Sequence, residues 1–378
     1  MGGYLRPGGI KVGRPLLVIF LGPPGSTPEE ELVDGARRAA ALDALDMAMA
    51  TGAYERALLL TPSPDALGSL PRGVEVVTDE GPFHFGHRLQ EVVAKLKAHS
   101  LVYIGGGALP LLSPQDWTAV ALALARQEGV VSNNLHSSDL VGVRPAQAIL
   151  SIEPPARDNA LARLLAGAGL PAWEMPRTLS TTFDLDTPAD VAILKLTGYA
   201  PGPRLQRWVR EAPLELGRYQ ALLPLLTNPQ AQLFVAGRIG SHVWRSLEEG
   251  TACRVRLLAE ERGLQALGLR ARSLLGMMAE ALGEEGLARA LALLGDAAVV
   301  DTRVLMSHLG IEASRRDRFL SDLGWPDEIG EPRLRCLTHA LISAPVPVLL
   351  GGHSLVTGGI MALARFAWEM RDRGMGLR

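Results

Sequence analysis

Short apolar runs alternate with longer helical patterns through the first half of the chain. The strand-like runs cover residues 16–21, 56–61, 74–78, 101–104 and 129–132, and the helical patterns cover 29–51, 86–99 and 114–127. Alternation of this kind predicts an α/β fold with a mostly parallel, Rossmann-like sheet and helices on both faces. The first run, 16–21, is too short to span a bilayer and is interpreted as a buried first strand.

The chain is long enough for two domains. Its 378 residues exceed what one hydrophobic core usually supports. The first pattern breaks at the Tyr-Ala-Pro-Gly-Pro run 199–203, and strand–turn–helix units then restart with strands at 232–236, 297–300 and 346–350. We therefore predict a first domain at 1–200 and a second, smaller α/β domain of unknown type at 201–378.

Bulk composition restricts the class of partner. The net charge is −2, with 47% hydrophobic and 21% charged residues, which is typical of a soluble globular protein and predicts no nucleic-acid or membrane partner. Cys253 and Cys336 are the only cysteines and form no metal-binding spacing, so a reducing cytoplasm is the simplest location. Whether the protein forms an oligomer is left open by the sequence.

An acidic turn is the clearest candidate site. Phe183–Asp190 reads as a strand that carries Asp184 and Asp186, followed by a Thr187–Pro188 turn that opens a helix. Carboxylates placed in this way are expected at the edge of a sheet, where open α/β folds bind their ligands. The pattern is typical of a site that handles a nucleotide.

Two polar turns in the first half suit the same role. Gly106 and Gly107 belong to a glycine run after the strand-like segment 101–104, where a backbone can approach a ligand closely. A second turn concentrates small hydrogen-bonding side chains after the strand-like segment 129–132: Asn133, Asn134, Ser138 and Asp139. These residues suit a base, ribose or sugar, although ordinary turn geometry also explains them.

Together these segments resemble the GT-A-like nucleotidyltransferase superfamily, which includes molybdenum cofactor guanylyltransferase and 2-phospho-lactate guanylyltransferase. Residues 184–191 resemble the family's Asp-x-Asp-Thr-Pro-x-Asp-Leu segment, and 107–113 resemble its Gly-Asp-x-Pro-Leu-Leu segment, over roughly the first half of the chain. The resemblance implies a GT-A-like fold, Mg²⁺ held by Asp186, catalytic roles for Asp184 and Asp186, and a nucleotide-binding loop with Gly22 and Gly25.

The chain departs from the family pattern at two places. Ala108 stands where the family has its metal-binding aspartate, and a methyl group cannot coordinate Mg²⁺. Pro23 and Pro24 remove backbone N–H groups from the expected phosphate loop. Other residues are candidates to replace the missing groups, namely Asp139 or Asp158 for the metal and Arg37, Arg38 or Arg144 for phosphates.

Three polar turns in the second half form a further candidate pocket. They follow the predicted strands, and if those strands are parallel neighbours their ends share one sheet edge. The candidate residues are Arg238, Ser241, His242, Asp301, Arg303, His353 and Ser354. Arg238 and Arg303 would hold an anion, or else the arginines and Asp301 pair with one another to stabilise the domain. The charged run 254–262 is interpreted as a solvated helix.

These observations lead to one preferred function and two alternatives. The preferred function is transfer of a nucleoside monophosphate from a nucleoside triphosphate to a small phosphorylated or hydroxylated acceptor, with Mg²⁺ neutralising charge. One alternative is a non-catalytic protein that binds or senses a nucleotide or nucleotide-sugar. The other is an enzyme whose active site lies in the C-terminal domain.

Overall fold

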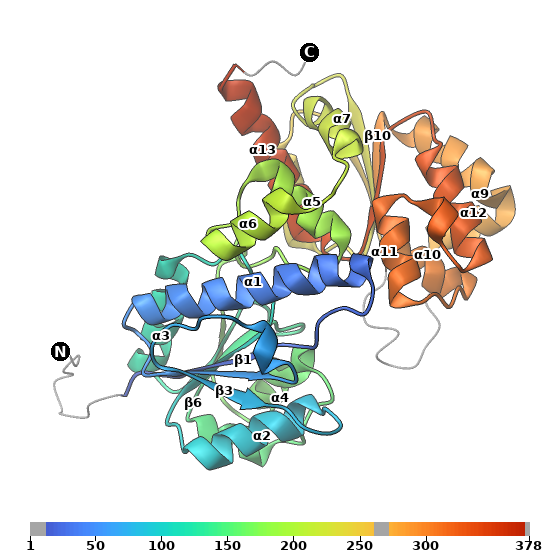
Figure 1. Cartoon of the computed structure of the whole chain (residues 1–378). Coiled ribbons are helices and arrows are strands. Elements are labelled where there is room, and N and C mark those ends of the chain that lie inside the picture. The colour runs from blue at the N-terminus through green and yellow to red at the C-terminus, as the bar shows by residue number, and fades with distance from the viewer. Residues whose placement is uncertain (1–12, 261–271, 375–378) are drawn as a thin grey trace. The chain divides into compact units, whose positions relative to one another are not determined.

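The computed structural model describes residues 13–260 and 272–374 (Figure 1). They form two compact units. The first unit comprises the described residues of Met1–Pro24, with Asp34–Thr182 and Ala200–Leu205, and the second comprises Gly25–Val33, Phe183–Tyr199 and the described residues of Gln206–Arg378. The acidic turn Phe183–Asp190 therefore belongs to the second unit. The chain passes between the units after residues 24, 33, 182, 199 and 205.

The first unit contains a seven-stranded sheet. Its strands are β1 (Leu16–Phe20), β2 (Ala57–Thr61), β3 (Val74–Thr78), β4 (Leu101–Gly105), β5 (Gly129–Ser132), β6 (Leu140–Arg144) and β7 (Ala172–Glu174). They lie in the order β3-β2-β1-β4-β6-β5-β7, and only β6 runs antiparallel to its neighbours. The mostly parallel, Rossmann-like sheet predicted from the alternating pattern is confirmed.

Helices cover both faces of this sheet. They are α1 (Pro28–Ala50), α2 (Phe85–Leu96), α3 (Pro114–Arg126) and α4 (Leu161–Gly167). Helices α1 and α3 lie on one face of the sheet, and α2 and α4 lie on the other (Figure 1). The start of α3 is encoded locally, because the Ser113 hydroxyl accepts from the Asp116 N–H while Asp116 accepts from the Ser113 N–H.

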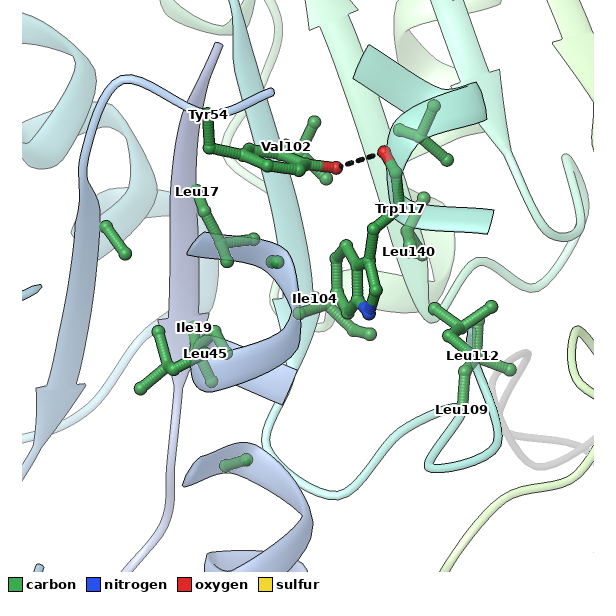
Figure 2. Packing of buried hydrophobic residues seen from close by; sticks show 14 of the residues in the cluster. Leu17, Ile19, Leu45, Tyr54, Val102, Ile104, Leu109, Leu112, Trp117 and Leu140 are labelled. Carbon is green, nitrogen blue, oxygen red and sulfur yellow. Dashed lines mark hydrogen bonds between the residues drawn. The ribbon is translucent and has the colours of Figure 1, made fainter. Parts of the chain in front are cut away.

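An aromatic pair lies at the centre of the core between the sheet and helices α1 and α3. The Tyr54 hydroxyl donates to the Trp117 carbonyl at 2.9 Å, and the two rings meet edge to face with centroids 6.0 Å apart (Figure 2). Leu109 and Leu112, from the loop after β4, are buried in the same cluster. The loop that carries the glycine run is therefore anchored in the core by its own leucines.

The second unit contains a separate four-stranded sheet. Its strands are β8 (Gln232–Gly237), β9 (Arg254–Ala259), β10 (Ala297–Asp301) and β11 (Val348–Gly351). They lie in the order β11-β10-β8-β9, and every neighbouring pair is parallel. A second α/β unit with a smaller sheet is thus present, and the three strands predicted to carry polar turns are neighbours as the sequence analysis requires.

Helices also flank the second sheet. One face packs against α9 (Leu274–Leu294), α10 (Thr302–Leu309), α11 (Arg315–Leu323) and α12 (Pro332–Ile342). The remaining helices are α5 (Pro188–Thr197), α6 (Pro203–Glu211), α7 (Gly217–Leu226), α8 (Ser241–Gly250) and α13 (Ile360–Asp372). Of these, α5, α7 and α8 contact strands of the sheet, and α13 packs against all three (Figure 1).

Two local expectations from the sequence are wrong. The charged run after Cys253 begins as strand β9, because Arg254, Val255 and Arg256 alternate between exposed and half-buried positions with the period of a strand; residues 261 and 262 lie outside the described residues. Residues 183–186 belong to neither sheet, although Phe183 and Leu185 are buried as in a strand. Within the described ranges, no helix is long and apolar enough to cross a membrane.

Candidate functional site

The strand order of the first unit reverses between β1 and β4. The chain winds outward from β1 through β2 and β3, and then continues on the other side of β1 with β4, so this is the point at which open α/β sheets bind ligands. The Gly106 N–H donates to the Phe20 carbonyl at 2.8 Å, and the Gly105 N–H donates to the Asp139 carbonyl at 3.2 Å. These bonds join the loops that follow β1, β4 and β5 into one polar edge.

Gly107 lies against the side chain of Arg37. It has a φ of 91°, and a Cβ atom at this position would lie 2.3 Å from Arg37 Cγ. Only glycine combines this left-handed backbone with so close an approach. The aliphatic part of Arg37, on α1, therefore packs directly against the glycine turn, and its guanidinium lies 3.9 Å from the Asp34 carboxylate.

Ala108 lies in an apolar environment, unlike a residue that binds a metal. It is partly buried and packs against the hydrophobic core, next to the fully anchored Leu109. Arg144, a second candidate for phosphate binding, instead donates to the carbonyls of Leu124 and Ala125 at the end of α3. Arg144 therefore caps the C-terminus of α3.

The loop after β5 is held together by one buried amide. The Asn133 oxygen accepts from the backbone N–H groups of Asp139 and Leu140, and its nitrogen donates to the Asp139 carboxylate and to the Thr181 carbonyl. Both ends of this amide are thus used within the unit. Asn133 shapes the loop, and the half-buried Asn134 amide, whose oxygen accepts from the His136 N–H, is the more accessible group.

Two carboxylates approach Tyr103 at the same edge. The Tyr103 hydroxyl donates to Asp158 Oδ2 at 3.0 Å, and burial, followed by the charge of Asp158 and then of Asp139, raises the Tyr103 pKa well above its ordinary value. The buried Ser138 hydroxyl donates to the Asp158 carbonyl at 3.0 Å. Asp158 is therefore bound to Tyr103 and Ser138, and the charge of Asp139 acts on the same phenol.

The loop expected to hold phosphates is occupied by the protein's own carboxylates. The Gly25 N–H donates to Glu31 Oε2 at 3.1 Å, and the Ser26 N–H donates to Glu30 Oε2 at 3.0 Å. The Ser26 hydroxyl also donates to Glu30, which lowers the pKa of that carboxyl. Glu30 and Glu31 lie in the first turn of α1, where the backbone N–H groups favour negative charge. The N–H groups of Gly25 and Ser26 are therefore bound to carboxylates of the same chain.

The fit of a magnesium ion follows from these positions. No group of three or more His, Cys, Asp or Glu side chains among the described residues is arranged to hold a metal. Mg²⁺ is commonly held by one or two carboxylates together with substrate phosphates, and Asp139 and Asp158 are the candidate carboxylates of the first unit for such an ion. Asp184 and Asp186 are half-buried and belong to the second unit.

In the second unit, an ion pair lies at the point where the strand order of the sheet reverses. The sheet reverses its winding between β8 and β10, and Arg238 and Asp301 occupy the ends of these strands. Arg238 Nε donates to Asp301 Oδ2 at 2.7 Å and its Nη2 donates to Oδ1 at 3.2 Å. Asp301 is fully buried and also accepts from the backbone of Arg303. The two residues predicted to line a pocket thus pair with each other.

Arg303 is bound by a residue that the sequence analysis does not single out. Its Nη1 and Nη2 donate to the two carboxylate oxygens of Asp322 at 2.9 and 2.5 Å. Burial acts to lower the Arg303 pKa, but the Asp322 charge outweighs it and the pKa is raised, with a smaller contribution from Asp186. Arg303 therefore stays protonated in a bidentate ion pair with Asp322, and the charge of Asp186 also acts on it.

The glycine turn after β11 receives the start of α5. A Cβ atom on Gly351 would lie 3.2 Å from Ala189 Cβ, and one on Gly352 would lie 3.0 Å from Thr187 Cγ2. The buried Ser354 hydroxyl donates to Asp190 Oδ2 at 2.6 Å. The acidic turn is thus docked on this glycine turn, and Ser354 serves the docking contact.

Asp190 organises that contact. Its Oδ2 also accepts from the Thr187 hydroxyl and from the N–H groups of Thr187 and Asp186, which forms the capping box of α5. Complete burial raises the Asp190 pKa to about 7, against the opposing effect of the Ser354 hydrogen bond. The Thr-x-x-Asp spacing is the sequence signal that identifies this aspartate.

The remaining predicted residues take varied positions. Ser241 is the exposed first residue of α8 and His242 is the half-buried second, while His353 is half-buried beside Ser354. Gly22 is exposed in the loop after β1. Four residues at these edges were not assigned a role by the sequence, namely Glu30, Glu31, Tyr103 and Asp322. Only the first-turn position of the two glutamates offered a local signal.

No family model and no curated protein matches this sequence. Solved structures give likenesses to about half of the chain. A cytidylyltransferase from Leptospira borgpetersenii serovar Hardjo-bovis is 13% identical with a TM-score of 0.38, over 54% of this chain and 93% of that one. A CMP:2-keto-3-deoxy-manno-octonic acid synthetase complexed with CTP is 13% identical with a TM-score of 0.36, over 49% and 98%. A 4-diphosphocytidyl-2C-methyl-D-erythritol synthase from Anaerococcus prevotii is 12% identical with a TM-score of 0.33, over 47% and 95%. Likenesses at these values assign neither substrate nor activity to the chain.

Proposed function

We propose that this is a nucleotidyltransferase-like protein whose first unit binds a nucleotide or nucleotide-sugar at the crevice between β1 and β4. The glycine turn after β4 supplies close backbone approach, Arg37 supplies positive charge, and Asn134 and Asp139 supply groups for a base or sugar. The sheet reversal provides the rigid scaffold on which such sites are built.

We further propose that the bound compound is recognised without transfer of its nucleoside monophosphate. The observation that carries this step is the pairing of the Gly25 and Ser26 N–H groups with Glu31 and Glu30. Transfer depends on positioning and neutralising phosphates. The Gly25 and Ser26 N–H groups are already bound to carboxylates, and Ala108 in the first unit cannot ligate a metal, so the chain offers fewer groups that could neutralise phosphates.

Titration of the full chain with nucleoside triphosphates and nucleotide-sugars, with and without Mg²⁺, tests the proposal. Calorimetry is expected to show binding that is insensitive to Mg²⁺, and a pyrophosphate assay with phosphorylated and hydroxylated acceptors is expected to show no release. Replacement of both Glu30 and Glu31 by Ala should raise triphosphate affinity by about tenfold, because it frees the two N–H groups for an anion. Failure of every nucleotide to bind at millimolar concentration would overturn the proposal.

Nucleoside monophosphate transfer to a small acceptor is the second candidate, favoured by the two carboxylates at Tyr103. In this case Mg²⁺, held by Asp139 and Asp158 or by Asp186, neutralises phosphate charge when it is bound. Pyrophosphate release that depends on Mg²⁺ and disappears in Asp158→Asn would establish it. Asp186→Ala separates the two metal assignments, because it removes metal-dependent binding only if that carboxylate is a ligand.

A further inference from the structure

One aromatic side chain is exposed at the carboxyl edge of the first sheet. Phe83, in the loop between β3 and α2, is 55% exposed, and Phe83 and Trp244 are the two exposed aromatic side chains among the described residues. The Phe83 ring meets the Phe20 ring edge to face, with centroids 6.0 Å apart. Phe20 is the last residue of β1, and its carbonyl accepts from the Gly106 N–H. Phe83 therefore lies beside the end of β1, where the strand order reverses.

The Phe83 ring is the exposed end of a cluster of four aromatic side chains. Phe20 also meets Phe85 and Tyr103 edge to face, with centroids 5.9 and 5.3 Å apart, and these three rings are buried. The Tyr103 hydroxyl donates to Asp158, one of the candidate carboxylates of the first unit. The cluster thus extends from the exposed ring to the polar groups at the same edge of the sheet.

The chain on either side of Phe83 limits the movement of its ring. Pro82 restricts the backbone directly before it. After it, the Gly86 N–H donates to the Pro155 carbonyl at 2.9 Å, and a Cβ atom on Gly86 would lie 2.5 Å from Pro155 N. The start of α2 is therefore packed closely against another loop of the first unit. A ring held in this way loses little conformational entropy when a ligand contacts it.

The start of α2 does not explain an exposed aromatic residue at this position. Phe83 precedes the N-cap residue His84, and from there an apolar side chain often packs against the fourth residue of the helix. That residue is Arg88, whose guanidinium is paired with Asp79 and Glu91. The solvent-facing part of the Phe83 ring is therefore not used in a contact of this kind.

We propose that the base of the bound nucleotide stacks on the Phe83 ring. The protein then recognises a nucleotide through its base, and not only through its phosphates or sugar. Every base has a π-face, so stacking accepts purines and pyrimidines alike. This inference rests on the nucleotide site proposed above, and it adds the part of the ligand that is recognised and the residue that recognises it.

Titration of the full chain with ATP, GTP, CTP, UTP and inorganic tripolyphosphate tests the inference, because the five anions share the triphosphate and only four carry a base. In calorimetry, at least one nucleotide is expected to bind at least about tenfold more tightly than tripolyphosphate. Nucleotides that bind no more tightly than tripolyphosphate would overturn the inference and leave anion binding intact. Absence of binding by every nucleotide contradicts the proposed function itself, and the inference with it.

Substitutions assign the effect to one ring. Phe83→Ala is expected to weaken nucleotide binding about tenfold and to leave tripolyphosphate binding unchanged, whereas Trp244→Ala, which removes the exposed ring of α8, should change neither. Phe83→Leu keeps an apolar contact with Phe20, so a loss of nucleotide affinity in this variant as well separates stacking from packing. Phe83→Trp should retain binding and add a fluorescence signal that nucleotide quenches and tripolyphosphate does not. Unchanged nucleotide affinity in Phe83→Ala, or an equal loss for tripolyphosphate, contradicts the inference.

Discussion

The Ser354 hydroxyl donates a 2.6 Å hydrogen bond to the carboxylate of Asp190, which lies 164 residues earlier in the chain. Both side chains are fully buried, and the contact holds the N-terminus of α5 on the glycine turn after β11. The acidic turn Phe183–Asp190 therefore contributes to the stability of the second unit, whatever role Asp184 and Asp186 have.

Asp190 should make the stability of the protein depend on pH. Its folded pKa of about 7 lies above the ordinary value of 3.8, so the folded state binds the proton more tightly. The free energy of unfolding should therefore fall as the pH rises from about 4 through 7, by at most about 4 kcal/mol. Asp190→Asn, which mimics the neutral acid, should flatten this dependence in urea unfolding, and Asp327→Asn, at an exposed position, should preserve it. An unchanged slope in Asp190→Asn would show that the carboxyl does not titrate in this range.

The Arg238–Asp301 pair should stabilise the second unit. Arg238→Ala leaves the fully buried Asp301 without its guanidinium partner, and the free energy of unfolding should fall by about 3 kcal/mol. Arg254→Ala, at an exposed position of β9, should change it by less than about 0.5 kcal/mol. Chemical denaturation of both variants makes the comparison. A small effect for Arg238→Ala would instead favour a ligand-binding role for this arginine.

Gly107 should not tolerate a side chain. Gly107→Ala imposes a φ of 91° on a residue with a Cβ atom and forces that atom against Arg37, so a loss of about 2 kcal/mol is expected. Gly22→Ala is the matched control, because a Cβ atom there meets nothing within 4 Å and the backbone is not left-handed. Thermal unfolding of the two variants distinguishes them. Similar melting temperatures would mean that the loop adjusts.

Local patterns in the sequence were sufficient to predict most of the strands and helices. Apolar runs such as Leu16–Phe20 and capping signals such as Ser113 with Asp116 act within a few residues, so they predict strands and helix starts directly. The sequence analysis assigns no element to β6 (Leu140–Arg144), because that strand follows β5 without a helix and runs antiparallel. Strand β9 (Arg254–Ala259) is not predicted, because its arginines are also typical of a solvated helix and make the alternation between exposed and half-buried positions hard to recognise.

The sequence alone determined the α/β class, most strands of each sheet and the polar turns that follow them. Only the tertiary structure decided what those turns do, because their partners are distant in the chain and strand order brings them together. Asp301 meets Arg238 across two adjacent strands, and Asp190 meets Ser354 where α5 docks beside β11. Composition and spacing name the charged groups, but which opposite charge neutralises each one depends on three-dimensional proximity and burial.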